Sequence, residues 1–258
     1  MRYHKVLFSN LGYARGIRGS TREHVLYAYR HVFCPKSTQL QAIAALKRLI
    51  REEDPEVCCL VEIDSGSVTS AFVNQIEHLV DDTYPYFDIE NKYGETSLLR
   101  HLPGTSGNCN GFIVKHEVPF RKIYFSGGTK RLVYEIDLDD DLTLFFAHFS
   151  LRRDVRRGQF LELRELFEQA RGEVVIMGDF NIFRGHAELA PLLRGGGLEV
   201  ITDVESETFR IDGRVFAVDL CVCSSSLVPR ARVHVREQSF SDHAAIVLEV
   251  GGPEAART

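Results

Sequence analysis

A carboxylate and an amide follow a buried strand in this sequence at a spacing that suits chemistry. The run VVIMGDFN at 174–181 begins with four apolar residues and can turn at Gly178. Because side chains alternate along an extended chain, Asp179 and Asn181 should lie on the same side of the backbone. They would place a charged base or metal ligand beside a group that both donates and accepts hydrogen bonds. A strand that ends in an ordinary Asx turn would have the same sequence.

Other apolar runs also carry a polar side chain at or near one end. These side chains are Asn10 after 6–9, Glu62 within 57–64, His148 within 142–150, Asp219 within 216–223, and Asp242 and His243 before 244–250. An unpaired carboxylate inside a buried strand is costly, so Asp219 should have a partner. Asn10, Glu62 and Asp242 supply hard oxygen ligands of the kind that Mg²⁺ or Mn²⁺ prefers.

Hydrogen-bond donors for an anionic group complete the set. His148, His243 and Asn181 could all donate to a phosphate-like oxygen. Taken alone, Ser-Asp-His at 241–243 would be an ordinary polar turn. If the strand ends meet on one edge of a sheet sandwich, however, these residues form a compact polar cluster over a rigid base.

The order of these residues resembles the endonuclease/exonuclease/phosphatase superfamily, which has the deoxyribonuclease-I-like fold. Gly-Asp-Phe-Asn at 178–181 together with Ser-Asp-His at 241–243 carries the resemblance, which extends from residue 6 to residue 250. It implies an α+β protein, a four-layered α/β/β/α sandwich of two mixed β-sheets. We therefore expect a single domain over 1–250 and a frayed tail over 251–258.

The resemblance also implies metal-dependent attack of water on a phosphoester. In that scheme Glu62 binds the divalent metal, Mg²⁺ or Mn²⁺, and Asn10 and Asp242 lie nearby. Asp179 orients or deprotonates the attacking water. The sequence leaves open whether Asp179 or His243 takes the proton, because a carboxylate near a metal stays ionised and an imidazole paired with a carboxylate can titrate near neutrality.

Contacts to the phosphoryl group are implied for the remaining residues. Asn181 and His148 would hydrogen-bond the phosphoryl oxygens. His243 would contact the phosphate as well, with its ring held by Asp219 or Asp242.

Charge is distributed unevenly along the chain. The net charge of −5 gives no overall attraction to a polyanion. Residues 11–37, however, have a local net charge of +4, from Arg15, Arg18, Arg22, Arg30 and Lys36 against Glu23. This segment also has apolar residues at helical spacing. It could form a basic amphipathic helix that grips a phosphate or lipid head group, or a lid helix whose apolar face packs on the sandwich.

A second basic cluster, at 152–157, follows His148. It could neutralise further phosphates, or it could be the solvated first turn of a helix, where basic residues oppose the helix dipole. The substrate-binding candidates are Arg15, Arg18, Arg131 and Arg152.

The surroundings of the glutamate favour one branch of the superfamily. The chain has no tryptophan, and LVEID at 60–64 differs from the motif of the abasic-site nucleases. It resembles more closely the bacterial branch near sphingomyelinases and phosphoinositide phosphatases. We predict hydrolysis of a small phosphodiester or of a lipid or inositol phosphate. A metal-dependent nuclease acting on DNA or RNA is the alternative, and a non-catalytic binding domain of the same fold is the second.

Periodicity predicts the elements that would position these residues. Helices are expected over 38–53, with a capping box from Thr38 to Gln41, over 68–79, and after Asp154 as far as Gly172. Strands are expected near 5–9, 57–62, 111–115, 122–125, 132–138, 142–148, 174–177, 218–223, 232–235 and 245–250.

Cysteine usage and the N-terminal residues give the expected compartment. The six cysteines include no CxxC pair, so we expect small core hydrophobes in a reducing compartment. No signal peptide or membrane span is visible, which predicts a cytoplasmic protein. We expect a monomer whose partner is a phosphorylated small molecule or a lipid head group. Nucleic acid or a membrane surface could also be a partner.

Overall fold

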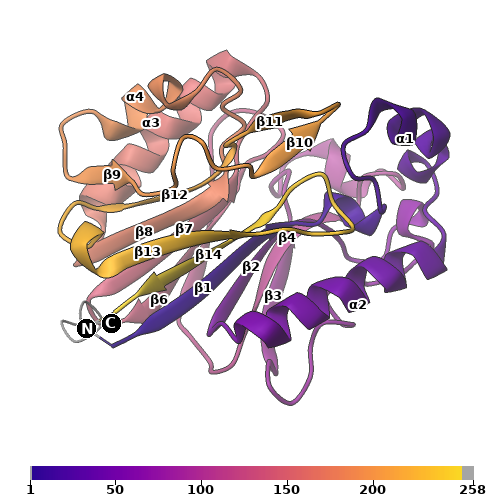
Figure 1. Ribbon diagram of the computed structural model, residues 1–258, viewed down its shortest axis with the longest axis horizontal. Coiled ribbons are helices and arrows are strands. Elements are labelled where there is room, and N and C mark those ends of the chain that lie inside the picture. The colour runs from indigo at the N-terminus through magenta and orange to yellow at the C-terminus, as the bar shows by residue number, and fades with distance from the viewer. Residues whose placement is uncertain (1, 252–258) are drawn as a thin grey trace.

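The computed structural model describes residues 2–251, and two six-stranded sheets form its centre (Figure 1). The first sheet has the strand order β13-β14-β1-β2-β4-β3. Both ends of the chain meet in it, because β14 pairs antiparallel with β1 and β1 pairs parallel with β2. Its strands are β1 (His4–Asn10), β2 (Val57–Asp64), β3 (Tyr86–Asn91), β4 (Asn108–Val114), β13 (Ala231–Arg236) and β14 (Ala245–Val250).

The second sheet has the strand order β5-β6-β7-β8-β12-β9. At its centre β7 and β8 are parallel, and β12 runs antiparallel to β8. Its strands are β5 (Phe120–Tyr124), β6 (Leu132–Asp139), β7 (Leu142–His148), β8 (Glu173–Asp179), β9 (Leu198–Val200) and β12 (Asp219–Ser224). A separate hairpin is formed by β10 (Phe209–Ile211) and β11 (Arg214–Phe216).

Helices cover the outer faces of the two sheets. In Figure 1, α2 lies along the first sheet, and α3 and α4 lie along the second. The short α1 is at the end of the molecule towards which the β10–β11 hairpin points (Figure 1). The helices are α1 (Thr21–Leu26), α2 (Lys36–Glu53), α3 (Arg153–Gln169) and α4 (Ala190–Leu193). The expected four-layered α+β sandwich is thus confirmed.

Three apolar cores hold the layers together. Between the two sheets the buried side chains include Phe8, Phe112, Tyr134, Phe146 and Met177. The core between α2 and the first sheet includes Ile43, Leu46 and Ile50, and the core between α3 and the second sheet includes Phe160 and Leu163. Truncating such a side chain to alanine typically costs about 2–5 kcal/mol, so these cores give the strand ends a rigid base.

The prediction of a helix over 68–79 is wrong. A single 3-10 turn, Val68–Ser70, forms there, and Ala71 and Phe72 have left-handed backbone conformations. The cause is the buried carboxylate of Asp64, which accepts hydrogen bonds from the backbone N–H groups of residues 66 and 67 and from the hydroxyl of Ser70. These local bonds compete with helical ones and hold the segment as a loop.

The expectations for 11–37 and for the helix starts are also corrected. Before α2, residues 11–35 form only α1 and 3-10 turns. Gly12, Gly16 and Gly19 have positive φ and prevent a helix before residue 20, and α1 ends at Tyr27, whose φ of −108° and ψ of 18° are not helical. The other helices exist as expected but begin slightly earlier. The first residue of α2 is Lys36, so Thr38 lies inside its first turn, and Asp154 is likewise inside the first turn of α3.

The cysteines are free and buried, as expected of core residues. Of the tail expected to fray, 251–258, only Gly251 lies within the described residues, and its N–H donates to the carbonyl of Arg230. None of the helices in the described part of the chain is both long enough and apolar enough to cross a membrane.

Candidate active site

Strand register brings polar side chains from both sheets to one edge of the sandwich. In the second sheet, Asp179 is the register partner of both His148 and Asp219. In the first sheet, Asn10 lies beside the β2 residue that precedes Glu62. Asn10 connects the sheets, since its Nδ2 donates to Oδ2 of Asp179 at 3.1 Å. The apolar strands therefore end in one cluster.

Asp179 is the centre of this cluster and is almost completely buried. Its Oδ2 lies 3.0 Å from Nε2 of His148, and its Oδ1 accepts from the backbone N–H of Asn181 at 3.1 Å. Burial alone would raise the pKa of Asp179. The imidazoles of His148 and His243 outweigh burial and hold that pKa well below its usual range, so the carboxylate stays ionised.

The orientation of the Glu62 side chain is set by an irregularity in strand pairing. The β2–β4 register shifts between Leu60 and Ile63, and Glu62 has a left-handed backbone with φ of 53°. A β-bulge of this kind redirects a side chain, and strain of this kind is concentrated at functional sites. Burial opposes ionisation of Glu62, but the charge of His148 in its protonated form and the charge of Lys92 lower the pKa of Glu62 to about 2. The side chain remains 22% exposed, so it can reach a ligand.

His148 lies between an anion and a cation. Its Nε2 faces both the Asp179 carboxylate and the Lys130 ammonium. It can donate to Asp179 or accept from Lys130, but not both at once. Its Nδ1 is buried and has no hydrogen-bond partner among residues 2–251. Burial, and then the charge of Lys130, lower the His148 pKa to about 4, so the ring is neutral at pH 7.

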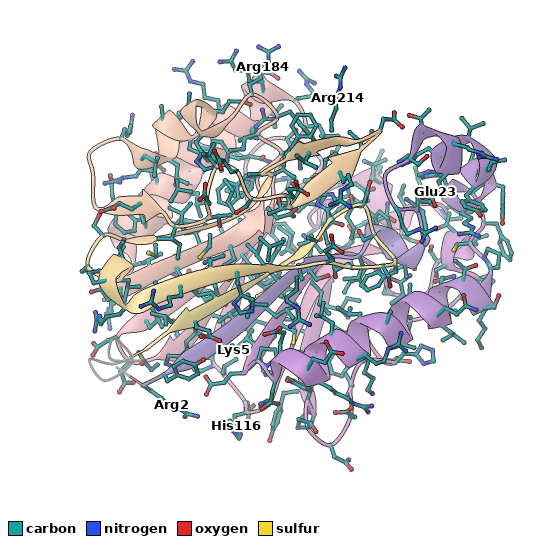
Figure 2. All side chains as sticks on the ribbon, viewed as in Figure 1. Arg2, Lys5, Glu23, His116, Arg184 and Arg214 are labelled. Carbon is teal, nitrogen blue, oxygen red and sulfur yellow. The ribbon has the colours of Figure 1, made fainter. Side chains whose placement is uncertain are left out.

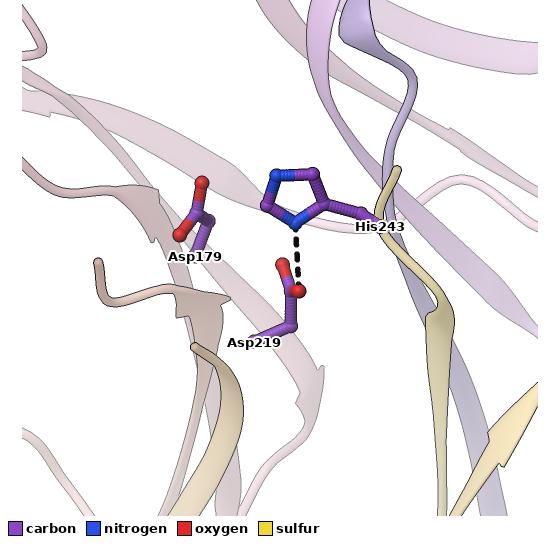
Figure 3. A group of neighbouring side chains, drawn as sticks. All are labelled: Asp179, Asp219 and His243. Carbon is purple, nitrogen blue, oxygen red and sulfur yellow. Dashed lines mark hydrogen bonds and ion pairs between the residues drawn. The ribbon is translucent and has the colours of Figure 1, made fainter. Parts of the chain in front are cut away.

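Asp219 and His243 form a buried pair next to Asp179 (Figure 3). Nδ1 of His243 lies 2.8 Å from Oδ2 of Asp219, and its Nε2 lies 3.4 Å from Nδ2 of Asn10. Burial raises the pKa of Asp219. At His243 burial opposes the charged ring, but the carboxylates, Asp219 first, raise its pKa. The pair therefore holds a proton at neutral pH, and the partner expected for Asp219 is His243.

The β10–β11 hairpin and the residue before it fix this pair. Oγ1 of Thr208 accepts from the backbone N–H of Asp219 at 2.9 Å, and the Thr208 carbonyl accepts from residue 244 at 2.7 Å. The rings of Phe209 and His243 lie 4.7 Å apart between centroids. The hairpin also contacts the 11–37 segment, because the N–H of Asp212 donates to the carbonyl of Gly19 at 2.8 Å. A Cβ at Gly19 would lie 1.8 Å from the carbonyl oxygen of residue 210, so this contact requires glycine.

The donor set fits an oxygen-preferring divalent cation. Asp179, Asp219 and His243 offer ligand atoms that lie within 4.8 Å of one another. Oδ1 of Asp219 is buried and has no hydrogen-bond partner within the described chain, so it is available to a cation. Ionised Glu62 adds an oxygen ligand on the other side of His148. This combination of carboxylates with one imidazole suits Mg²⁺ or Mn²⁺.

Two of the predicted site residues have positions that modify their expected roles. Nδ2 of Asn181 donates to the carbonyl of Phe149 at 3.0 Å, so this amide also secures the turn after β8. Asp242 lies beside His243 on the wall of a groove of about 420 Å³. Burial raises the pKa of Asp242, and the charge of Glu62 raises it further.

Sequence reasoning missed two lysines and a tyrosine. Nζ of Lys130 lies 4.0 Å from Oε1 of Glu62, and Lys92 is buried against the hydroxyl of Tyr13. Burial lowers the Lys92 pKa to about 8, although Glu62 opposes this. The alternation of side chains along a strand could have predicted the position of Lys130. Leu132 faces the core between the sheets, so Lys130, two residues earlier, faces the same side. Lys92 and Tyr13 lie in loops that give no such signal.

The four arginines proposed to bind substrate have different surroundings. Arg15 lies 4.5 Å over the ring of Tyr13, and Arg18 lines the groove beside His243 while pairing with Glu23. The other two are not brought to the cluster. Arg131 faces the outer side of the sheet, where its Nε donates to the carbonyl of Phe125 at 2.6 Å. Arg152 is exposed and pairs with Asp154 at 2.9 Å.

A family model decides the identification. The model described as the Endonuclease/Exonuclease/phosphatase family matches residues 32–243. The chain belongs to this family. Family members are phosphoester hydrolases, nucleases among them, that generally depend on a divalent metal, so membership indicates a metal-dependent phosphoesterase. A search of curated protein sequences finds no match.

Solved structures share the fold. Truncated TDP2 from Caenorhabditis elegans has a TM-score of 0.64 at 15% identity and covers 97% of this chain and 98% of its own. Sphingomyelinase C from Streptomyces griseocarneus also has a TM-score of 0.64, at 13% identity, with 97% and 100% covered. The endonuclease domain of TRAS1, a telomere-specific non-LTR retrotransposon, has a TM-score of 0.58 at 16% identity, with 97% and 99% covered. The expected family and fold are thus confirmed.

Proposed function

We propose that this protein hydrolyses a small phosphodiester, or a lipid or inositol phosphate, with the help of Mg²⁺ or Mn²⁺. One observation carries the proposal: side chains from five strands of two sheets meet around an ionised, buried Asp179. An ionised carboxylate that contacts an amide and an imidazole is suited to orient an attacking water. Structural carboxylates are rarely held in this way inside a cluster with unpaired polar atoms.

In this proposal the metal would be held by Glu62, with Asn10 and Asp242 nearby, and would supply charge neutralisation at the phosphoryl group. It would not lie between Asp179, Asp219 and His243, because Asp219 and His243 already bind each other. Asp179 would orient and accept the proton of the attacking water. His243 would contact the phosphoryl oxygens while Asp219 fixes its ring. This division of roles follows from position, because Nδ1 of His243 is already committed to Asp219.

His148, Asn181 and Lys130 would complete the binding of the phosphoryl group. His148 lies in contact with Asp179, and Lys130 supplies a positive charge next to Glu62. Positive charges aimed at the place where negative charge develops are among the larger contributions to catalysis. Arg15 and Arg18 would contact substrate farther from the reacting atoms.

The groove beside His243 favours a small substrate over a long polynucleotide. Its wall includes Arg18 and Arg210, but also Glu207, Glu237 and Asp242. A nucleic-acid backbone requires a continuous basic track, and carboxylates in the path would repel it. A nuclease acting on DNA or RNA remains the second candidate, because the similar structures include an endonuclease domain as well as a sphingomyelinase.

The test is hydrolysis of bis-p-nitrophenyl phosphate with Mg²⁺ or Mn²⁺, with and without EDTA. We expect EDTA to abolish turnover and Asp179→Ala to lower kcat by about 10²–10³. The matched control is Asp82→Ala, an exposed aspartate, which should keep full activity. Turnover that survives EDTA, or an Asp179→Ala variant within about twofold of wild type, would contradict the proposal. A panel of sphingomyelin, inositol phosphates and oligonucleotides would then separate the two substrate classes.

A further inference from the structure

Large apolar side chains are exposed on three segments of the chain outside the active site. The set, here named the apolar rim, comprises Val25, Leu26, Tyr29, Val32, Phe33, Val68, Phe72, Leu98 and Leu102. The most exposed of them are Val32 at 73%, Phe72 at 73% and Leu98 at 82%. Such exposure leaves a side chain in water on most sides, so these residues protrude from the surface. Contiguous exposed apolar surface on a folded protein usually marks an interaction site.

Backbone contacts connect the three segments of the apolar rim. The N–H of Cys34 donates to the carbonyl of Thr69 at 2.8 Å, which joins the 25–33 segment to the 68–72 segment. The N–H of Ser65 donates to the carbonyl of Gly107 at 3.0 Å, which joins the loop that carries Leu98 and Leu102 to the chain just before Val68. The apolar rim is therefore assembled from segments that are far apart in the sequence and are joined by backbone hydrogen bonds.

The apolar rim lies beside the active-site edge. Nη1 of Arg30 donates to the carbonyl of Arg15 at 2.9 Å, and Arg15 lies over the ring of Tyr13, which follows Asn10. Figure 2 shows Glu23, just before the 25–33 segment, on the outer end of the molecule. A ligand that covered the apolar rim would thus lie next to the catalytic cluster.

Positive charge accompanies the exposed apolar side chains. Residues 11–37 have a local net charge of +4 in a chain whose net charge is −5. Arg22 and Lys36 are exposed on either side of the 25–33 segment. Protruding apolar side chains surrounded by cations are the combination that binds the interface of an anionic bilayer.

We propose that the apolar rim and the cations of 15–36 form a docking surface for an anionic lipid membrane. Charge argues against a second copy of this chain, since a symmetric dimer would bring two segments of +4 together. Six of the nine side chains of the apolar rim are valine or leucine, which offer bases no stacking platform, and this argues against nucleic acid. The proposal goes beyond the proposed function, because docking does not require catalysis.

The test is sedimentation of the full-length protein with vesicles. We expect the wild type to bind vesicles of phosphatidylcholine mixed with phosphatidylglycerol, and to bind phosphatidylcholine alone far more weakly. Val32→Ser combined with Phe33→Ser should weaken partitioning at least about tenfold, because two protruding apolar groups are lost. Arg22→Glu and Lys36→Glu should each weaken it by about fivefold or more, and added salt should mimic them.

A matched control uses apolar side chains of similar exposure elsewhere. Tyr3→Ser combined with Val204→Ser removes groups that are 49% and 61% exposed and lie outside the apolar rim. This variant should bind vesicles like the wild type. Equal loss in the control and in the Val32/Phe33 variant would overturn the proposal, as would a wild type that fails to bind anionic vesicles.

Two other occupants are distinguished by separate readouts. A wild-type dimer that becomes monomeric in the Val32/Phe33 variant would show that a second copy covers the apolar rim. Oligonucleotide binding that is lost in the same variant would show that nucleic acid covers it. Either result would overturn the membrane proposal.

Docking and catalysis can fail independently in these experiments. The Val32/Phe33 variant should hydrolyse bis-p-nitrophenyl phosphate at the wild-type rate in the absence of lipid. Asp179→Ala should sediment with anionic vesicles as the wild type does. Loss of vesicle binding therefore tests the docking surface, and loss of soluble turnover tests the proposed function.

Discussion

Two clusters of buried histidine and carboxylate lie at the two ends of the same strand, β1, about 20 Å apart for a strand of this length. At the end opposite the active site, His4 is buried with Nδ1 at 2.8 Å from Glu56 and Nε2 at 3.1 Å from Asp139. Both ring nitrogens face carboxylates, so both donate and the ring is an imidazolium. Since Asp139 ends β6, this cluster ties the two sheets together.

The active-site cluster uses the same residue types and leaves them incompletely paired. Nδ1 of His148 and Oδ1 of Asp219 have no hydrogen-bond partner within the described chain, whereas each ring nitrogen of His4 has one. Left-handed backbone also gathers at the active-site end, at Glu62 and Asn181. Buried polar groups are normally satisfied, so the difference separates a cluster that stabilises the fold from one that is completed by a ligand.

The same substitution at the two ends should give opposite results, and the largest effect is expected at His243. We expect His243→Gln to lower kcat for a phosphodiester by about 10²–10³, because the ring that Asp219 positions is removed. Steady-state kinetics at saturating metal measures this, with circular dichroism to confirm folding. Retention of more than about a tenth of the activity would remove His243 from the reaction.

His4→Gln should instead affect stability. Replacing the imidazolium leaves Asp139 without this cation and leaves Glu56 only its exposed partner Arg2, so we expect the free energy of unfolding to fall by about 2 kcal/mol. Urea denaturation measures the change, and kcat should stay within about twofold of wild type. His116→Gln, at an exposed histidine (Figure 2), is the control and should leave stability unchanged. A large fall in kcat for His4→Gln would show that the two ends are coupled.

Adjacent cations in the loop before β6 provide a sharper comparison within the active-site end. Lys130→Gln should lower kcat/KM by about tenfold or more, because it removes the charge next to Glu62 and His148. Arg131→Gln removes an equal charge that faces away from the cluster, and its kcat/KM should change little. Equal losses in the two variants would mean that only the general field of the protein matters.

The smallest expected effect is a pH dependence of stability that comes from His4. Burial disfavours the charged ring, but the hydrogen bonds and charges of Glu56 and Asp139 outweigh it and raise the His4 pKa. The stabilisation is therefore complete below about pH 6.5 and is lost as the pH rises through the folded-state pKa. We expect the wild type to lose more stability than His4→Gln over this interval, measured by urea denaturation across the pH series. Parallel curves for the two proteins would show that His4 is neutral.

Much of the fold and the cluster could be predicted because apolar strands and their ends have strong local signals. The run before Asp179 and the run before His148 are both continuous and apolar, and their parallel pairing brings the two residues together. Residues held by loops gave no such signal. Lys92 reaches the cluster because the chain turns after β3, and the hairpin that fixes His243 consists of two three-residue strands.

The segment 25–33 shows the limit of periodicity. Its apolar residues have helical spacing, which normally indicates a buried face, yet Val25 and Val32 are exposed. The helix ends at Tyr27, whose φ of −108° and ψ of 18° are not helical, and the α-helix that forms there is six residues long. The spacing of apolar residues predicts which side of a regular helix would be apolar. It does not predict whether another part of the same chain covers that side.

The β10–β11 hairpin belongs to neither sheet, and this has a mechanical consequence. One side of it contacts the carbonyl of Gly19 just before α1, and the other contacts the ring of His243. We therefore expect a shift of α1 to move the imidazole of His243 through these short contacts while the two sheets stay in place. A load applied at the periphery of the molecule would change the orientation of one reactive ring, and it would pass through two neighbouring contacts of Asp212, one with Gly19 and one with Thr21.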